Sequence, residues 1–171
     1  MADGESVPRL VLISGATGVG KTTLAKAVAH EMGLARIASS DTIREVMRAT
    51  ASSSDPALNR SSYGRGEVGD AGTDWEDAAR AVEPGIDAVV ERARQQGVDL
   101  VLEGVHVIPS RRLLSAWETA GGAAVGIVVK IEDEETHRGR IEQREANTWR
   151  GAERYRIGFE RIRSIQRTIE E

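Results

Sequence analysis

Short apolar runs alternate with longer amphipathic stretches along most of the chain. In the longer stretches apolar residues recur every three or four positions, which is typical of helices that bury one face. The short runs predict buried strands at 9–13, 35–38, 99–103 and 125–131. Apolar strands that alternate with helices form parallel sheets with both faces covered. The pattern therefore predicts an α/β fold with a parallel sheet of four or five strands and helices on both faces.

The predicted helices account for most of the remaining residues. They are expected at 21–32, from Asp41, at 73–96, at 109–120 and from Asp133 to the end of the chain. Gly33 is well suited to end the first of them. Pro84 predicts a break or a new start within the third, because proline removes a helical hydrogen bond. The segment 51–72 is polar and rich in serine and glycine, and it predicts a loop.

The composition indicates one soluble domain. The chain has 171 residues without an internal repeat or a linker, so we expect a single domain over 1–171. It contains no cysteine, which excludes disulfides, thiolate metal sites and thiol nucleophiles. Its acidic N-terminus is unlike a signal peptide, and no apolar run approaches the roughly 18 residues that span a bilayer. We therefore expect a cytoplasmic protein, monomeric or homodimeric, without a membrane partner.

Residues 15–23, GATGVGKTT, contain the phosphate-loop pattern G-x-x-x-x-G-K-[ST]. The pattern follows a predicted strand and opens a predicted helix, the context in which it binds phosphates. Glycines let successive N–H groups curl around an anion, and the helix N-terminus adds its dipole. Lys21 is expected to reach the β- and γ-phosphates, and the Thr22 hydroxyl to ligate Mg²⁺. The expected nucleotide-binding residues are Gly15, Ala16, Thr17, Gly18, Val19, Gly20, Lys21, Thr22 and Thr23.

A second glycine pattern, GRGEVG at 64–69, matches G-x-G-x-x-G without the context that gives the pattern meaning. No strand precedes it, and no clear helix follows it. We interpret it as loop composition, with a flexible cover over a substrate as the alternative.

Two acidic residues each follow a predicted strand. Asp41 comes after 35–38, and Glu103 ends 99–103. Parallel strands end at the same edge of a sheet, so both acids should lie beside the phosphate loop, where small-molecule kinases place the acceptor. There a carboxylate can take the proton of the acceptor hydroxyl, or hold Mg²⁺ directly or through water. Either acid could be the base, and Asp41 can also serve as a helix N-cap.

An arginine and a histidine lie near these acids in the sequence. Arg44 is one turn beyond Asp41 and can face the same cleft, where a guanidinium can bind a carboxylate or a phosphate through two parallel hydrogen bonds. His106 follows the third predicted strand and is equally compatible with substrate contact and with a structural role. His30, late in the first helix, is expected on the surface.

The C-terminal part of the chain is rich in arginine. Nine arginines fall within 138–167, but acidic residues are interspersed and the formal net charge is −4, so we do not expect nucleic-acid binding. His137, Arg140 and Arg144 share one face of the predicted helix. We expect a helical lid at about 133–155 that closes over the triphosphate and places arginine on the transferring phosphoryl group. The lid arginines are Arg140 and Arg144, with Arg150 and Arg154 behind them.

The phosphate loop alone does not separate a kinase from other nucleotide-binding proteins. A guanine-specific switch would carry an N-K-x-D motif, and none occurs. The other residues favour a kinase that uses ATP and Mg²⁺ to phosphorylate a hydroxyl of a small molecule. The alternatives are a kinase for an antibiotic such as an aminoglycoside or for a sugar-like metabolite, a regulatory nucleotide-binding protein without kinase activity, and a nucleic-acid-associated ATPase.

Beyond these separate motifs, the sequence resembles the 2-phosphoglycerate kinase family of P-loop kinases. The resemblance rests on the phosphate loop and on SSDTIREVMR at 39–48, VEPGIDAVVERARQQGVDLVLEGVHVIP at 82–109 and ERYRIGFERIRSIQRTI at 153–169. It implies a three-layer P-loop kinase fold and the phosphorylation of 2-phosphoglycerate by ATP to give 2,3-bisphosphoglycerate. It also implies that Asp41 addresses the acceptor hydroxyl or the metal, that Arg44 and His106 help to bind the acceptor, and that Arg140 and Arg144 belong to the lid.

Two features of this sequence differ from the pattern of that family. Such kinases usually have a fifth strand after the lid helices, and its following loop helps to hold adenine, whereas this chain ends at Glu171 in a predicted helix. A truncated sequence or a different mode of adenine binding would account for the difference. The segment between the Asp41 helix and Trp75 is short and glycine-rich, which allows a changed acceptor.

Overall fold

The structure is a computed structural model that describes residues 7–50, 55–59, 69–146 and 153–171. The described residues form one four-stranded parallel sheet in the order β2-β3-β1-β4. The strands are β1 (Arg9–Ser14), β2 (Ile37–Ser39), β3 (Leu100–Glu103) and β4 (Ala123–Val128). The predicted α/β architecture is therefore confirmed, with the smaller of the two expected strand numbers.

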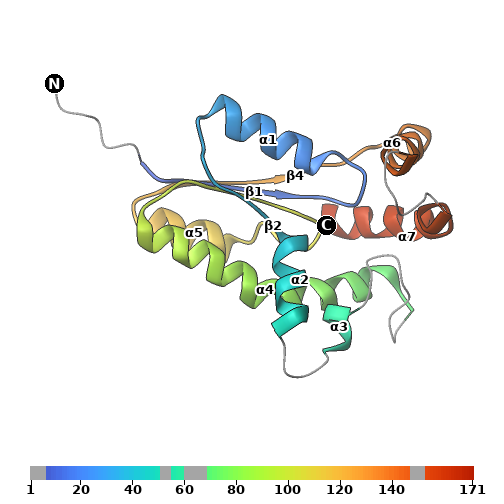
Figure 1. The fold of residues 1–171 in the computed structure, drawn as a ribbon, viewed down its shortest axis with the longest axis horizontal. Coiled ribbons are helices and arrows are strands. Elements are labelled where there is room, and N and C mark those ends of the chain that lie inside the picture. Colours follow the sequence, from blue (N-terminus) through green and yellow to red (C-terminus); the bar gives the residue numbers. More distant parts are fainter. Residues whose placement is uncertain (1–6, 51–54, 60–68, 147–152) are drawn as a thin grey trace.

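Seven helices among the described residues surround this sheet. They are α1 (Lys21–Glu31), α2 (Ser40–Thr50), α3 (Pro56–Asn59), α4 (Ala71–Gln96), α5 (Arg111–Thr119), α6 (Glu134–Ala146) and α7 (Glu153–Glu170). Figure 1 shows α1 on one face of the sheet, α4 and α5 on the other, and α6 and α7 beyond the ends of the strands. Within the described part of the chain, none of these helices combines the length and the apolar character needed to cross a bilayer.

The alternation of side chains along β1 divides the core between the two faces. Leu10 and Leu12 pack in one cluster with residues of α4 and α5, among them Val82 and Trp117. Val11 and Ile13 pack in a second cluster with residues of α1 such as Ala25. Successive side chains of a strand point to opposite faces, so a strand that is apolar at every position needs a helical layer on each side.

The longest helix differs from its prediction. We expected a break near Pro84, but α4 runs without interruption from Ala71 to Gln96. Pro84 is exposed, whereas Val82 and Ile86 on either side of it are buried in the core. Packing of both halves of the helix therefore outweighs the missing hydrogen bond. The prediction of a break is wrong.

Other predicted boundaries were also misplaced. The predicted loop at 51–72 contains α3 and the start of α4, whose N-cap Asp70 accepts a hydrogen bond from the Thr73 backbone N–H at 2.9 Å. Residues 51–54 and 60–68 of that loop, which include most of the second glycine pattern, lie outside the described residues. The second strand was predicted at 35–38 and lies at Ile37–Ser39, and the fourth was predicted at 125–131 and lies at Ala123–Val128. Both were expected to be buried, but as the outer strands of the sheet they contain no buried residue.

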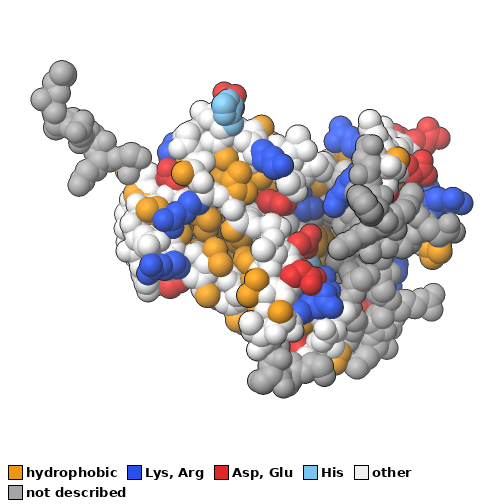
Figure 2. All heavy atoms as spheres, in the orientation of Figure 1, with side chains coloured by type: hydrophobic (Ala, Val, Ile, Leu, Met, Phe, Trp, Pro, Cys, Tyr) orange, Lys and Arg blue, Asp and Glu red, His pale blue; other side chains and the backbone are white. Residues whose placement is uncertain are grey.

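One edge of the sheet is β2, which pairs only with β3 among the described residues, and the other edge is β4. Between β2 and α4 lies a hollow lined by Ala35, Arg36, Ile37, Ala38, Ala88, Val89, Arg92, Ala93 and Leu100. Figure 2 shows hydrophobic side chains gathered on this face, with lysine and arginine side chains around them. The hollow shares no residue with the cavity at the phosphate loop described below.

Candidate active site

The phosphate loop joins the end of β1 to the start of α1, and its backbone depends on glycine. Gly15, Gly18 and Gly20 have φ values of 146°, 84° and 100°, which are strained for residues with a side chain. A Cβ on Gly15 would collide with the backbone oxygen of Val129, just after β4. The loop is therefore curled tightly against the end of the sheet, where only glycine fits.

The N-terminus of α1 is open to an anion. Gly20 is its N-cap, no side chain in the described part of the chain makes a capping hydrogen bond, and the first turn carries no acid. The first N–H groups of a helix have no partner within the helix, and the helix dipole favours negative charge there. These N–H groups are available to a phosphate.

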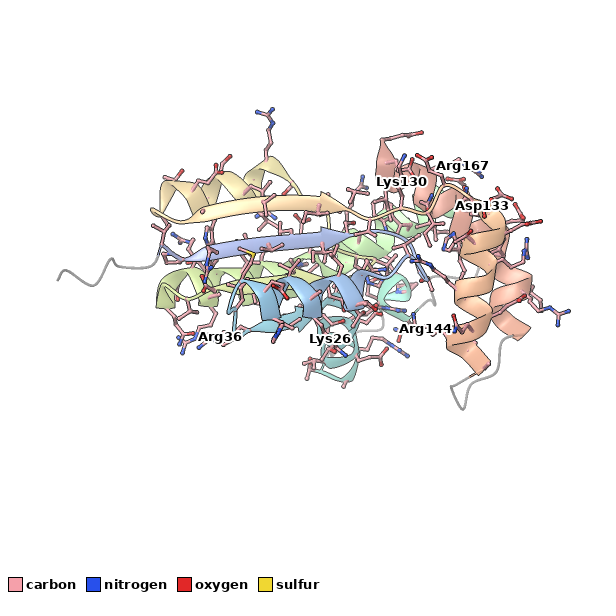
Figure 3. All side chains as sticks on the ribbon, turned by 90° about the horizontal axis from the view of Figure 1, so that it is seen from above. Lys26, Arg36, Lys130, Asp133, Arg144 and Arg167 are labelled. Atoms are coloured by element: carbon pink, nitrogen blue, oxygen red, sulfur yellow. The ribbon has the colours of Figure 1, made fainter. Side chains whose placement is uncertain are left out.

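A cavity of about 510 Å³ lies in front of this helix end. It is lined by Gly18, Gly20, Lys21, Thr22, Thr23, Arg140, Gln143 and Arg144. The cavity thus brings together the phosphate loop and the predicted lid arginines of α6. Figure 3 shows Arg144 on the side of α6 that faces the start of α1. A helix N-terminus with a lysine and two arginines around one cavity suits a polyanion.

Lys21 and Thr22 already have partners within the site. The Lys21 ammonium donates a hydrogen bond to the backbone oxygen of Ala16 at 2.7 Å. Burial lowers the pKa of Lys21 to about 8, while Glu103 and Asp41 act in the opposite direction. The Thr22 hydroxyl donates to the Glu103 carboxylate at 3.0 Å, so the acid at the end of β3 lies directly beside the predicted metal ligand.

A second group of polar residues lies where α2 begins against the loop after β3. The ring of His106 is 2% exposed, and its Nδ1 is 3.4 Å from the Ser40 hydroxyl and 3.6 Å from the Asp41 carboxylate. Burial lowers the pKa of His106 to about 4, against the opposing effect of Asp41, so the ring is neutral at pH 7. The Asp41 side chain is 72% exposed and faces solvent beside this ring.

Ser40 can approach His106 because of a glycine. Gly104 has a φ of 150°, and a Cβ at this position would overlap the Ser40 hydroxyl. The Ser40 oxygen also accepts a hydrogen bond from the His106 backbone N–H at 3.4 Å. The contact fixes the first turn of α2 against the end of β3, and with it the position of Asp41.

The chain matches one family over most of its length. The family profile described as the AAA domain covers residues 10–171. The chain belongs to the AAA domain family. The match includes the phosphate loop, both acids and the two C-terminal helices.

Similar curated proteins include 2-phosphoglycerate kinases from archaea. The 2-phosphoglycerate kinase of Methanothermobacter thermautotrophicus is 35% identical over 95% of this chain and 56% of its own length. That of Methanopyrus kandleri is 38% identical over 92% of this chain and 51% of its own length. The resemblance to 2-phosphoglycerate kinases is therefore confirmed, and the chain spans about half the length of the curated relatives it matches.

A solved structure agrees with the fold of the AAA domain. A crystal structure described as a candidate kinase from Chloroflexus aurantiacus has a TM-score of 0.52 and 20% identity, over 88% of this chain and 75% of that one. At this identity the likeness concerns the fold alone. The predicted P-loop kinase fold is confirmed.

The predicted site residues of the AAA domain fall into two neighbouring groups. Lys21, Thr22, Arg140 and Arg144 line the cavity at the phosphate loop. Asp41, Arg44 and His106 form the group at α2, and Glu103 lies beside Thr22, between the two. Asp41 is in the first turn of α2 and donates its own N–H to the Ser39 hydroxyl at 3.3 Å, so it is not the N-cap.

Arg44 is buried and contacts α3. The residue is 9% exposed, and its Nε donates a hydrogen bond to the backbone oxygen of Leu58 in α3 at 3.0 Å. Its charge also acts to lower the pKa of His106, so it lies near that ring. Binding of an acceptor by Arg44 stays a prediction.

Some predictions cannot be placed, and other residues were missed. Arg150 lies outside the described residues, as does the Arg154 side chain. Sequence reasoning missed Ser40 and Gln143. Gln143 lies three positions after Arg140, on the same face of α6, and helical spacing could have indicated it.

Proposed function

We propose that this chain is an ATP-dependent kinase that transfers the γ-phosphoryl group to a hydroxyl of a small molecule, with 2-phosphoglycerate as the first candidate acceptor. The observation that carries the proposal is the cavity in front of α1. The N-terminus of α1, which has no side-chain cap within the described part of the chain, surrounds one space together with Lys21, Arg140 and Arg144. That space suits the triphosphate of a nucleotide. The curated relatives are named for the same reaction class.

The residues beside Lys21 fit a magnesium ion. Within the described residues no three or more His, Cys, Asp or Glu side chains are grouped to hold a metal by themselves. Thr22 and Glu103 offer oxygen atoms, and Mg²⁺ is commonly held by one or two protein oxygens together with substrate phosphates and water. Thr22 would hold the ion, with Glu103 beside it. When bound, Mg²⁺ neutralises charge on the phosphates.

The two acids would have different roles. Glu103 is 6% exposed and already accepts the Thr22 hydrogen bond, so we assign it to positioning that hydroxyl. Asp41 is exposed and close enough to Lys21 to influence its pKa, so we assign it as the base. The acceptor oxygen attacks the γ-phosphorus, its proton passes to Asp41, and the bond to the bridging oxygen breaks as ADP leaves.

The charges around the two groups favour an anionic acceptor. Lys21, Arg44, Arg140 and Arg144 are cationic, whereas only Asp41 and Glu103 are acidic in the groups described above. Guanidinium groups bind phosphates and carboxylates through parallel hydrogen bonds. A phosphoglycerate carries both groups. A cationic aminoglycoside would require more carboxylates.

The test is an acceptor screen with Mg·ATP in which phosphorylated products are followed by mass. The panel contains 2-phosphoglycerate, 3-phosphoglycerate and an aminoglycoside, each with and without the protein. We expect a bisphosphoglycerate. Nucleotide binding without any phosphorylated product would contradict the proposal and favour a regulatory protein. Hydrolysis that rises on addition of DNA or RNA would contradict it in favour of a nucleic-acid-associated ATPase.

A further inference from the structure

The predicted lid helix α6 contacts the phosphate loop through a buried histidine. The ring of His137 is 0% exposed, and its Nε2 lies 2.7 Å from the backbone oxygen of Thr17. A carbonyl oxygen can only accept a hydrogen bond, so Nε2 must carry the hydrogen. A donor on α6 therefore holds one peptide group of the loop, 120 residues away in the sequence.

The other ring nitrogen faces a guanidinium. Nη1 of Arg163, in α7, lies 3.5 Å from Nδ1 of His137, and a guanidinium can only donate. Nδ1 must then be the unprotonated nitrogen, which fixes His137 as the neutral tautomer with hydrogen on Nε2. Burial lowers the pKa of His137, and the nearby charges of Arg163, Lys21 and Arg140 act in the same direction, whereas the hydrogen bond to Thr17 acts in the opposite direction.

Arg163 is itself held in place by backbone oxygens between β4 and α6. Its Nη1 donates to Ile131 at 2.6 Å, and its Nη2 donates to Glu132 at 2.9 Å. The guanidinium thus cannot turn away from the ring without losing two hydrogen bonds. One connected set of contacts leads from α7 through Arg163 and His137 to Thr17.

The same face of α6 also packs against the next residue of the loop. Ile141, one turn beyond His137, lies where a Cβ on Gly18 would be, so the loop backbone and α6 are in direct contact. Phe159 of α7 meets the His137 ring edge-on, with centroids 5.5 Å apart. The ring is therefore enclosed by apolar neighbours as well as being hydrogen-bonded at both nitrogens.

The bond to Thr17 has a consequence for the next amide. The C=O of Thr17 and the N–H of Gly18 belong to one planar trans peptide and point in opposite directions. Anchoring the oxygen on α6 therefore fixes the direction of the Gly18 N–H. Gly18 lines the cavity, and phosphate loops bind their ligand through such N–H groups.

We propose that His137 is a positioning residue for phosphate binding, which holds the Thr17–Gly18 peptide in the orientation that presents the Gly18 N–H to a nucleotide phosphate. The inference rests on the proposed nucleotide site but not on the identity of the acceptor. It makes the arginine-rich C-terminal helices part of the phosphate loop's own support, in addition to any role as a lid.

The test is a series of substitutions that separates the hydrogen bond from the packing. H137F keeps a ring and loses both hydrogen bonds. The terminal amide of H137Q reaches the position of Nε2 and can donate to Thr17, whereas that of H137N reaches only the position of Nδ1. Binding of Mg·ADP is measured by calorimetry, with thermal unfolding of each variant beside it. The exposed histidine of α1 supplies the control H30Q.

We expect Mg·ADP to bind H137F and H137N about 5- to 100-fold more weakly than the wild type, because a buried carbonyl loses its donor. H137Q should recover most of the affinity, and H30Q should bind as the wild type does. A role in packing alone predicts the reverse order, with H137F at least as good as H137Q, and that order would overturn the inference. Should H137F fail to fold, equal affinities of H137Q and H137N would overturn it. A wild-type chain that binds no adenine nucleotide would overturn the proposed function as well.

Discussion

At the phosphate loop, two hydrogen bonds involve groups that a nucleotide and its metal would need. The Lys21 ammonium is bound to the Ala16 oxygen, and the Thr22 hydroxyl to Glu103. A ligand would therefore replace partners that these groups already have. Exchanging one hydrogen bond for another costs far less free energy than leaving a buried donor unpaired. Both side chains are thus held close to the place where they would act.

Lys21→Ala tests the role of the ammonium. We expect turnover to fall by at least two decades, because a cation on the transferring phosphoryl group stabilises the transition state. The free energy of unfolding in urea should change little, since Lys21 is bonded only to Ala16 among the contacts described above. Lys26→Ala, on the exposed side of α1, is the matched control and should leave turnover unchanged. A Lys21→Ala enzyme with near-wild-type turnover would rule out the role.

Asp41→Asn tests the assignment of the base. We expect kcat to fall by about two or more decades, the range usual when general acid–base catalysis is lost, with little change in KM for ATP. The amide is close in size to the carboxylate, and the side chain is exposed, so the fold should be retained. Steady-state kinetics with the acceptor found in the screen provide the measurement. A change confined to KM for the acceptor would make Asp41 a binding residue instead.

Most individual site residues near the phosphate loop could be predicted, because they are contiguous in the sequence. The contacts that support them could not. Ser40 and His106 are 66 residues apart, and Thr17 and His137 are 120 apart. Each contact depends on how α2 or α6 packs against a loop, and no local pattern encodes that packing. His137 was noticed only for sharing a face with Arg140 and Arg144.

At the scale of elements, the periodicity of apolar residues was a good guide to type and a poorer guide to boundaries. The four strands and the main helices were predicted because each carries an apolar run or an apolar helical period. Burial follows that pattern in β1 and β3, but the outer strands β2 and β4 contain no buried residue. Pro84 misled the prediction, since tertiary packing on both sides of it keeps α4 continuous. The short helix α3 was missed because a segment of four residues carries no helical period.

Glycine-to-alanine substitutions at two positions, one just after β3 and one within α6, should have opposite effects on the free energy of unfolding. Gly104→Ala places a methyl group on the Ser40 hydroxyl at a φ of 150°, so the free energy of unfolding should fall by about 1–3 kcal/mol or more. Gly139→Ala lies in α6 with nothing within 4 Å of the new Cβ, and should raise it by about 0.5–1 kcal/mol. Urea unfolding measures both.

The two glycine substitutions also test whether the contact between Gly104 and Ser40 matters for activity. Gly104→Ala should also lower kcat, because the start of α2 carries Asp41 and must shift. Gly139→Ala should leave kcat unchanged. Equal stability of Gly104→Ala and the wild type would mean that the Ser40 contact does not fix α2.

At the scale of the whole molecule, segments far apart in the sequence meet beyond the ends of the strands. The phosphate loop, the start of α2, the loop after β3 and helix α6 all contribute to the two groups of site residues. Parallel strands make this possible, since each strand delivers its following loop to the same edge of the sheet. Two of the junctions contain buried neutral histidines, His106 and His137, which makes the assembly sensitive to acid.

The pH dependence of stability follows from those histidines. The pKa of His106 is about 4 in the folded protein, compared with 6.5 for an ordinary histidine. Between these values the unfolded chain binds more protons than the folded one, so the free energy of unfolding falls as the pH is lowered. For His106 alone the loss is about 2 kcal/mol between pH 7 and pH 5, and the lowered pKa of His137 adds to it. Above about pH 7 both rings are neutral in either state, and their contribution is constant.

Urea unfolding at pH 7, 6 and 5 measures this effect, because ordinary carboxylates remain ionised over that range. We expect the free energy of unfolding of the wild type to decline steadily with pH. His106→Gln should be less stable at pH 7 but should show a shallower decline, since Gln binds no proton in either state. His30→Gln should keep the slope of the wild type, because His30 is exposed. Parallel slopes for the wild type and His106→Gln would show that burial of His106 does not make the fold sensitive to acid.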